Sequence, residues 1–148
     1  DLLLNQPERE YDIALCLLDL DNFKQINDIF GHSQGDLLLK LVADALTRET
    51  RLGDQVARLG GDEFALALLI TPGASDIGSI LDRLLVLISA IGGEVSENTV
   101  AISASIGISV SSADINDYEV LIHQADVAMY ASKKRGKNTY TFFSSELA

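Results

Sequence analysis

Two adjacent glycines followed by two adjacent acids occupy residues 60–63, and alternating apolar residues flank them on both sides. The alternation predicts two strands, and the glycine pair predicts a hairpin turn between them, because glycine adopts positive φ at no steric cost. Such a turn would hold Asp62 and Glu63 on a rigid backbone, where carboxylates suit a hard cation such as Mg²⁺. Glycines and acids also make ordinary surface turns, so this motif alone leaves a purely structural interpretation open.

Asp19 is a further candidate ligand, directly after the apolar run at residues 13–18, which predicts a buried strand. Neighbouring strands lie about 4.8 Å apart, so Asp19 and Asp62 could share a metal ion if their strands are adjacent. Two carboxylates at a sheet edge, with Mg²⁺ bridging phosphate oxygens, are the arrangement of nucleotidyl transfer. The spacing is compatible with that chemistry and does not establish that the two strands are neighbours.

A basic cluster near the C-terminus contains Lys133, Lys134, Arg135 and Lys137. It holds four of the 11 lysines and arginines of the chain. Cations at the end of a helix that stops at Gly136 explain the cluster in structural terms. A phosphate-binding group explains it equally well, and the residues leave both explanations open.

Composition narrows the class of protein. The 148 residues suffice for one domain with a hydrophobic core, and the net charge of −11 argues against binding of a nucleic-acid backbone. A nucleotide can still bind where a metal ion or a local basic cluster supplies positive charge. No apolar run reaches the length of a membrane span, and the single Cys16 lies in an apolar run. We therefore expect a cytoplasmic domain without direct membrane contact, with Cys16 reduced and buried.

Apolar residues at three- and four-residue spacing predict helices that pack by one face. The predicted inward faces comprise Leu37, Leu38, Leu41, Val42, Ala45 and Leu46, then Ile77, Ile80, Leu81, Leu84, Leu85 and Ile88, then Tyr118, Leu121, Ile122, Ala125, Ala128 and Met129. A shorter helix is predicted to be capped by Asp21 or Asn22 and to be broken by residues 31–35. Gly92 and Gly93 predict a further turn.

Strands and helices alternate along the chain, but the hairpin interrupts the alternation. This pattern favours an α+β fold with a mixed, mostly antiparallel sheet on which helices pack. Residues 100–110 alternate most clearly, and residues 139–143 predict a last strand. The sequence has no glycine-rich phosphate loop of the P-loop or dinucleotide-binding type, so a metal ion and cations must hold any bound phosphates.

Five separated stretches resemble, in order and spacing, the GGDEF family of diguanylate cyclases. In chain order they are DLDNFKQINDIFGHSQGD, RLGD, ARLGGDEFAL, SASIGIS and ADVAMYASKKRGKN. The resemblance covers about residues 11–143. It implies a five-stranded central sheet wrapped by helices, similar to nucleotide cyclases and the polymerase palm. It also implies a reaction that joins two GTP molecules into cyclic di-GMP and releases pyrophosphate.

By position, the resemblance assigns Asp19 and Asp62 as catalytic metal ligands, with the backbone carbonyl of Leu20 completing the shell. The implied metal is Mg²⁺, with Mn²⁺ as an alternative. Glu63 would lie beside them, either as a further ligand or as an aid to deprotonation of the 3′-hydroxyl, and the sequence does not choose between these roles.

The resemblance also implies a set of GTP contacts. They are Asn22, Phe23, Lys24, Asn27, Asp36, Gly60, Gly61, Lys133 and Lys137. Asn27 and Asp36 would read guanine, since a carboxylate can accept from its N1–H and N2–H together. Lys133 and Lys137 would contact the β- and γ-phosphates. The family more often has arginine at position 137, and lysine keeps the charge but loses the bidentate fork.

Arg51 and Asp54, shortly before the hairpin, resemble the inhibitory product site of the family. Cyclic di-GMP bound there would lower activity, and Arg58 would assist. Because one active site holds one GTP, the reaction requires a homodimer in the active state.

Two departures and two alternatives accompany the resemblance. We expect residues 1–148 to be a single GGDEF domain that lacks the usual D-x-L-T-G-L-x-N-R opening, with residues 144–148 starting a linker toward an EAL phosphodiesterase domain. The main alternative is a catalytically inactive module that binds GTP or cyclic di-GMP and controls such a neighbour. A generic acidic interaction domain is the remaining alternative, and the ordered motifs leave it little room.

Overall fold

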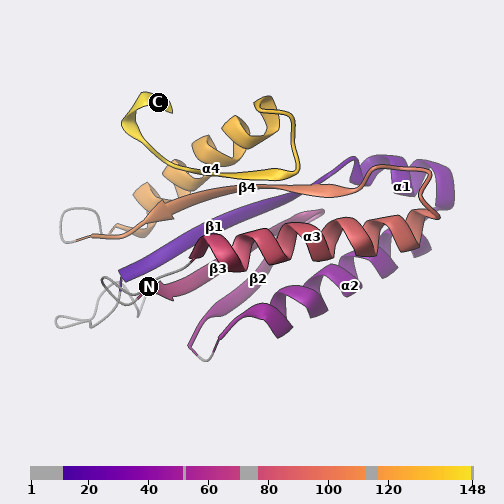
Figure 1. Cartoon of the computed structure of the whole chain (residues 1–148), viewed down its shortest axis with the longest axis horizontal. Helices are drawn as coiled ribbons and strands as arrows, with labels where there is room; N and C mark the ends of the chain where they lie inside the picture. Colours follow the sequence, from indigo (N-terminus) through magenta and orange to yellow (C-terminus); the bar gives the residue numbers. More distant parts are fainter. Residues whose placement is uncertain (1–11, 52, 71–76, 113–116, 148) are drawn as a thin grey trace.

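A central sheet of five strands in the order β2-β3-β1-β4-β5 organises the computed structural model, which describes residues 12–51, 53–70, 77–112 and 117–147 (Figure 1). The strands are β1 (Asp12–Asp21), β2 (Gln55–Gly60), β3 (Glu63–Ile70), β4 (Ser103–Val110) and β5 (Thr139–Phe142). The helices are α1 (Phe23–Phe30), α2 (His32–Glu49), α3 (Ile77–Ser96) and α4 (Tyr118–Lys134), followed by the 3₁₀ turn η1 (Ser145–Leu147).

The strand β1 lies at the centre of the sheet and is antiparallel to both of its neighbours, β3 and β4. Strand β2 forms the predicted hairpin with β3, and only β5 runs parallel to its partner β4. The mixed, mostly antiparallel sheet is therefore confirmed. Residues 1–11, which bear on the predicted lack of the family's opening segment, lie outside the described residues.

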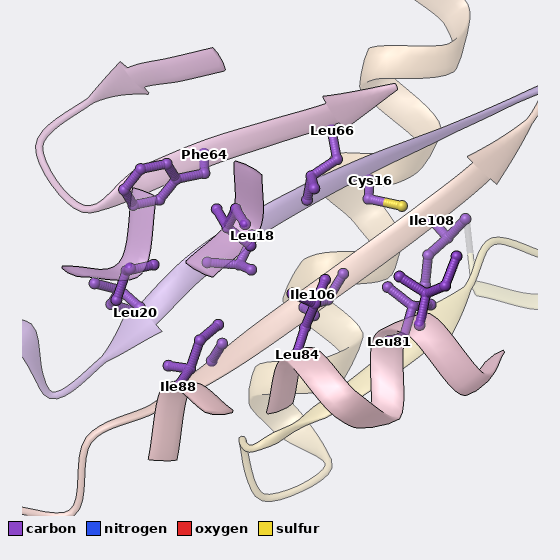
Figure 2. Close-up of a cluster of buried hydrophobic side chains, with 14 of the residues drawn as sticks. Cys16, Leu18, Leu20, Phe64, Leu66, Leu81, Leu84, Ile88, Ile106 and Ile108 are labelled. Carbon is purple, nitrogen blue, oxygen red and sulfur yellow. The ribbon is translucent and has the colours of Figure 1, made fainter. Parts of the chain in front are cut away.

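The two faces of the sheet are covered differently (Figure 1). Helices α2 and α3 cover one face, where Leu18, Leu66 and Ile106 pack against the α3 side chains Leu84 and Ile88 (Figure 2). Helix α4 covers the other face, which receives the alternate residues of β1. Alternation along β1 therefore sends one set of side chains into the larger core and the other set toward α4.

Cys16 is free and buried, as predicted, on the face of the sheet that α2 and α3 cover. Burial raises the pKa of its thiol to about 12, with a smaller contribution from the negative charge of Asp54. The thiol is therefore neutral and belongs to the core. Among the described residues, none of the helices combines the length and the apolar character needed to cross a bilayer.

The structure corrects two predicted interruptions of the helices, at residues 92–93 and 31–35. Gly92 and Gly93 do not form a turn but lie inside α3, since the inward face of that helix continues to Val95. A Cβ atom at Gly92 would overlap the Ile102 side chain, so this glycine permits a close approach of the chain leading into β4. Of residues 31–35, only Gly31, at φ 92°, interrupts the helices, because α2 begins at His32.

Two predicted inward residues are exposed. Leu37 is 42% exposed and Leu39 is buried instead, because the buried stripe of α2 lies on the side of the helix away from Leu37. Tyr118 is 40% exposed at the first residue of α4, where the buried stripe begins one turn later at Leu121.

Of the two predicted caps of α1, Asn22 is confirmed by its position and Asp21 is not. Asn22 occupies the cap position, but its side chain makes no capping hydrogen bond among the described residues. It donates instead to the Ala101 carbonyl at 2.7 Å. The carboxylate of Asp21 accepts hydrogen bonds from β4. The last two strands are shorter than expected, with β4 starting at Ser103 and β5 ending at Phe142.

Candidate active site

The pairing of β1 with β3 brings the predicted acids together. Asp19 is the register partner of Glu63, and the Leu20 amide donates to the Asp62 carbonyl at 3.2 Å. The turn before β3 contains Gly60 at φ 145° and Gly61 at φ 51°, so the predicted need for positive φ is confirmed. The adjacency that the sequence left open is thus present, with Asp62 held beside the end of β1.

A cation and a carboxylate meet at this end of β1. Lys133, from the last turn of α4, forms a salt bridge with the Oδ2 atom of Asp19. Burial lowers the pKa of Lys133, but the hydrogen bond and charge of Asp19, with Asp62 and Asp21, raise it above its usual range. Lys133 is therefore fully charged at neutral pH and compensates part of the negative charge of the site.

The carboxyl groups of Asp19 and Asp62 are close enough to interact directly. Burial first, and then the negative charge of Asp19, raise the pKa of Asp62 from 3.8 to about 6, while Lys133 acts in the opposite direction. Asp19 is only 8% exposed, and its Oδ1 atom is buried without a hydrogen-bond partner among the described residues. Two crowded carboxylates, one with an unpaired buried oxygen, fit a bound hard cation.

The donor set is incomplete without further oxygens. No group of three or more His, Cys, Asp or Glu side chains is arranged to hold a metal within the described residues. Glu63 is exposed, on the same face of the sheet as its register partner Asp19. The residues present fit a cation held by Asp19, Asp62 and the Leu20 carbonyl, with the remaining positions left to water or phosphate oxygens.

In the metal-free protein, we expect Asp62→Asn to raise thermal stability more at pH 8 than at pH 4. The folded pKa of about 6 exceeds the ordinary value of 3.8, so the folded state binds the proton more tightly between these values. Its stability contribution therefore falls as pH rises through that window, and asparagine removes the penalty. Melting temperatures in EDTA across this pH range measure the difference, and a difference independent of pH would contradict the coupling.

Polar side chains meet at the junction of α1 and α2. Asn27 of α1 packs over Gly35 in the first turn of α2, where a Cβ atom would overlap its Oδ1 atom. Asp36, the next residue, is exposed beside it, and Lys24 is exposed on α1. The structure thus brings Asn27 and Asp36 to one place. The prediction missed Gly35, although a glycine inside the first turn of a helix was a signal of close packing.

We expect Gly35→Ala to weaken GTP binding by about tenfold, because the new methyl group displaces the Asn27 amide that packs over Gly35. The fold should tolerate the change, since the overlapping atom ends a side chain and alanine favours a helix. Titration with GTP and with GMP measures the effect, which should be equal for both. Unchanged affinity for both nucleotides would place guanine elsewhere.

The basic cluster divides in two. The Nζ atom of Lys137 lies 3.4 Å from the Oδ1 atom of Asn22, at the end of β1, where Lys133 also points. Lys134 lies over the Tyr130 ring at 4.7 Å, and Arg135 donates to a threonine of β5 at 3.3 Å. Lys133 therefore pairs with an acid of the site and Lys137 with Asn22, while Lys134 packs against its own helix and Arg135 against β5. A cavity of about 480 Å³, lined by Asn22 and Lys137 among others, opens beside Lys137.

The predicted product site forms a braced turn. Asp54 accepts from the Arg51 amide at 2.9 Å and from the Leu69 amide at 2.8 Å, and its side chain is 1% exposed. Arg51 donates to the Leu69 carbonyl at 2.9 Å, yet its side chain stays 54% exposed. Arg58 donates to the Gly61 carbonyl at 3.0 Å and so braces the hairpin. Asp54 holds this turn, and Arg51 is the part that a ligand can reach.

Asp21 was missed as a site residue. It is 4% exposed and accepts from Ser103, Ser105 and the backbone of Asn138. The signal was present in the sequence, because residues two apart on a strand share a face, so Asp21 lies on the side of Asp19.

The sequence profile of the family described as "Diguanylate cyclase, GGDEF domain" matches residues 1–139. MucR of Pseudomonas aeruginosa, named as a bifunctional diguanylate cyclase/cyclic di-GMP phosphodiesterase, is 42% identical over 134 residues. That match covers 90% of this chain and 19% of MucR. The chain spans less than half of the length of the curated relatives that it matches.

Solved structures show the same fold. An EAL/GGDEF domain protein from M. capsulatus has a TM-score of 0.77 at 40% identity, covering 97% of this chain and 92% of that chain. The GGDEF domain of DgcB from Caulobacter crescentus, solved with c-di-GMP, has a TM-score of 0.76 at 31% identity, covering 89% and 78%. The profile match and these likenesses in sequence and structure show that the chain belongs to the GGDEF domain family of diguanylate cyclases.

Proposed function

We propose that this domain catalyses the condensation of two GTP molecules into cyclic di-GMP. The observation that supports this most directly is the convergence of Asp19, Asp62 and Lys133 at one end of β1, where one buried oxygen of Asp19 has no hydrogen-bond partner within the described part of the chain. Asn27 and Asp36 lie at the junction of α1 and α2, the two helices that follow β1 in the chain. A metal-binding acid pair, phosphate-binding cations and polar side chains that bind guanine are the parts that this reaction needs.

Each group of residues has its own role in the proposed reaction. Asn27 and Asp36 bind the guanine edge and orient the nucleotide. Lys133 and Lys137 neutralise the β- and γ-phosphates and so stabilise pyrophosphate as the leaving group. Asp19, Asp62 and the Leu20 carbonyl hold Mg²⁺ or Mn²⁺, which supplies charge stabilisation to the reacting phosphate.

Each bond is made between two subunits. The 3′-oxygen of one GTP forms a bond to the α-phosphorus of the other, and the bond from that phosphorus to the bridging oxygen of the β-phosphate breaks. The 3′-hydroxyl proton passes to solvent or to Glu63, which lies exposed beside Asp19. The same step repeated with the roles exchanged closes the ring, so a homodimer with one GTP per subunit is the active form.

The test is incubation of the purified domain at high concentration with GTP and Mg²⁺, followed by mass identification of the products. Cyclic di-GMP and pyrophosphate in a 1:2 ratio would support the proposal. GTP binding without product, in a dimeric sample, would favour the regulatory module instead. The use of GTP and the reduced, buried Cys16 support a cytoplasmic location.

We also propose that cyclic di-GMP inhibits the enzyme at Arg51, with Asp54 positioning the turn. Arg51→Ala is expected to raise the product concentration needed for half inhibition by about tenfold or more, because the exposed guanidinium is the group open to the ligand. Asp54→Ala should instead lower the melting temperature, since it removes the acceptor of the Arg51 and Leu69 amides. Inhibition curves and thermal scans on both variants separate the two roles, and unchanged inhibition in Arg51→Ala would exclude this site.

A further inference from the structure

Asp21 is a buried carboxylate whose two oxygens tie three segments together. Oδ2 accepts from the Ser103 hydroxyl at 2.6 Å and from the Asn138 amide at 3.1 Å, and Oδ1 accepts from the Ser105 hydroxyl at 2.7 Å. Asp21 and Ser103 are register partners across β1 and β4, so the strand pairing itself places these groups. The Asn138 amide belongs to the turn between α4 and β5, far away in sequence.

That turn is held in an unfavourable backbone conformation. Lys137 has φ 65° and Asn138 has φ 49°, and Asn22, which directly follows Asp21, has φ 65°. This region is uncommon for lysine, whereas asparagine tolerates it better than most other residues do. The three residues are linked, because Lys137 contacts the Asn22 side chain at 3.4 Å and Asn138 is bound to Asp21.

We infer that Asp21 is the positioning residue that sets Lys137, and with it the contact to the β- and γ-phosphates. This inference rests on the proposed function. The Asp21 carboxylate holds the backbone amide of Asn138, the residue directly after Lys137, and Asp21 itself directly precedes Asn22. It therefore determines where the Lys137 ammonium group and the Asn22 side-chain amide point. It acts through the turn and makes no contact of its own with the nucleotide.

Binding of two nucleotides separates positioning from a general structural role. With Asp21→Ala, affinity for α,β-methylene-GTP should fall about tenfold, the effect of one charged hydrogen bond, while affinity for GMP stays unchanged. GMP lacks the phosphates that Lys137 reaches. Asp21→Asn should recover most of the affinity, because its carbonyl oxygen can keep the Ser103 and Asn138 bonds while the Ser105 hydroxyl rotates to accept.

A double-mutant cycle tests whether the effect passes through Lys137. In the Lys137→Met background, Asp21→Ala should lower the affinity for α,β-methylene-GTP by less than a further twofold, since the cation that Asp21 positions is already gone. Ser109→Ala is the control, because it removes a different buried hydrogen bond of the sheet, in which the Ser109 hydroxyl of β4 donates to the Leu121 carbonyl at 2.6 Å. This control should lower thermal stability and leave both affinities unchanged.

Hydrogen exchange provides a readout that needs no nucleotide. The Asn138 amide should exchange at least about tenfold faster in Asp21→Ala, and measurably faster in Asp21→Asn, than in the wild type or Ser109→Ala. If Asp21→Ala does not fold, Asp21→Asn carries the test with smaller changes in the same direction. A wild type that binds neither nucleotide would refute the proposed function. An unchanged exchange rate of the Asn138 amide in Asp21→Ala would instead refute the role of the hydrogen bond from that amide to Asp21. If Asp21→Ala lowers the affinity for α,β-methylene-GTP and for GMP equally, the inference is overturned. It is also overturned if Asp21→Ala lowers the affinity for α,β-methylene-GTP by the full amount in the Lys137→Met background.

Discussion

Replacing Asp62 by alanine is expected to lower cyclic di-GMP synthesis by at least about a thousandfold while the domain stays folded. The carboxylate is one of the two acids that would hold the metal, and Asp19 alone cannot complete the site. Folding should not suffer, because the Leu20 amide bonds to the Asp62 backbone carbonyl and not to its side chain. Loss of the carboxylate also removes a repulsion, since burial and the charge of Asp19 raise its pKa to about 6.

Product formation from GTP, measured by mass, should be compared between Asp62→Ala, the wild type and Asp126→Ala. Asp126 is exposed on α4, so its alanine variant removes an acid of the same type away from the site and should keep wild-type activity. Melting temperatures of all three proteins in EDTA should agree within a few degrees. Retained synthesis by Asp62→Ala would contradict both the metal site and the proposed function. If Asp62→Ala instead loses much of its melting temperature, unfolding explains its inactivity, and the same assay is made with Asp62→Asn.

The hairpin that carries Asp62 was predictable because its signals are local. Alternating apolar residues and two glycines at positive φ define strand, turn and strand within a few positions. The closeness of Asp19 to Asp62 was not predictable from these signals, since the pairing of β1 with β3 depends on contacts between segments that are distant in the sequence. The resemblance to a known family supplied that missing information.

Side-chain contacts over long sequence distances explain the remaining errors. Gly92 looked like a turn residue, yet the Ile102 side chain makes a glycine necessary inside α3. Asp54 was predicted only as part of a product site, and the structure adds that both of its oxygens accept from backbone amides. Neither local propensity nor periodicity contains these constraints, because each depends on which segment packs against the residue in the folded chain.

Gly107→Ala is expected to destabilise the domain by about 3 kcal/mol. Gly107 lies in β4 beneath α4, and a Cβ atom there would overlap the Ala125 carbonyl oxygen and the Met129 amide nitrogen. The overlapping atoms are backbone atoms of a helix, so no side-chain rotation relieves the clash. Relief requires α4 to move away from the sheet, which also exposes the apolar contacts of Leu17 with Met129.

Thermal unfolding in EDTA measures this effect, and the expected loss lowers the melting temperature by about 10 °C for a domain of this size. Gly93→Ala is the matched control, because its Cβ atom meets only the end of the Asn98 side chain, at 2.8 Å, and alanine favours a helix interior. This control should melt at or above the wild-type temperature. A loss below about 3 °C in Gly107→Ala would show that α4 does not lie so close to β4. Because α4 also carries Lys133, the displaced helix should weaken α,β-methylene-GTP binding in the fraction that remains folded.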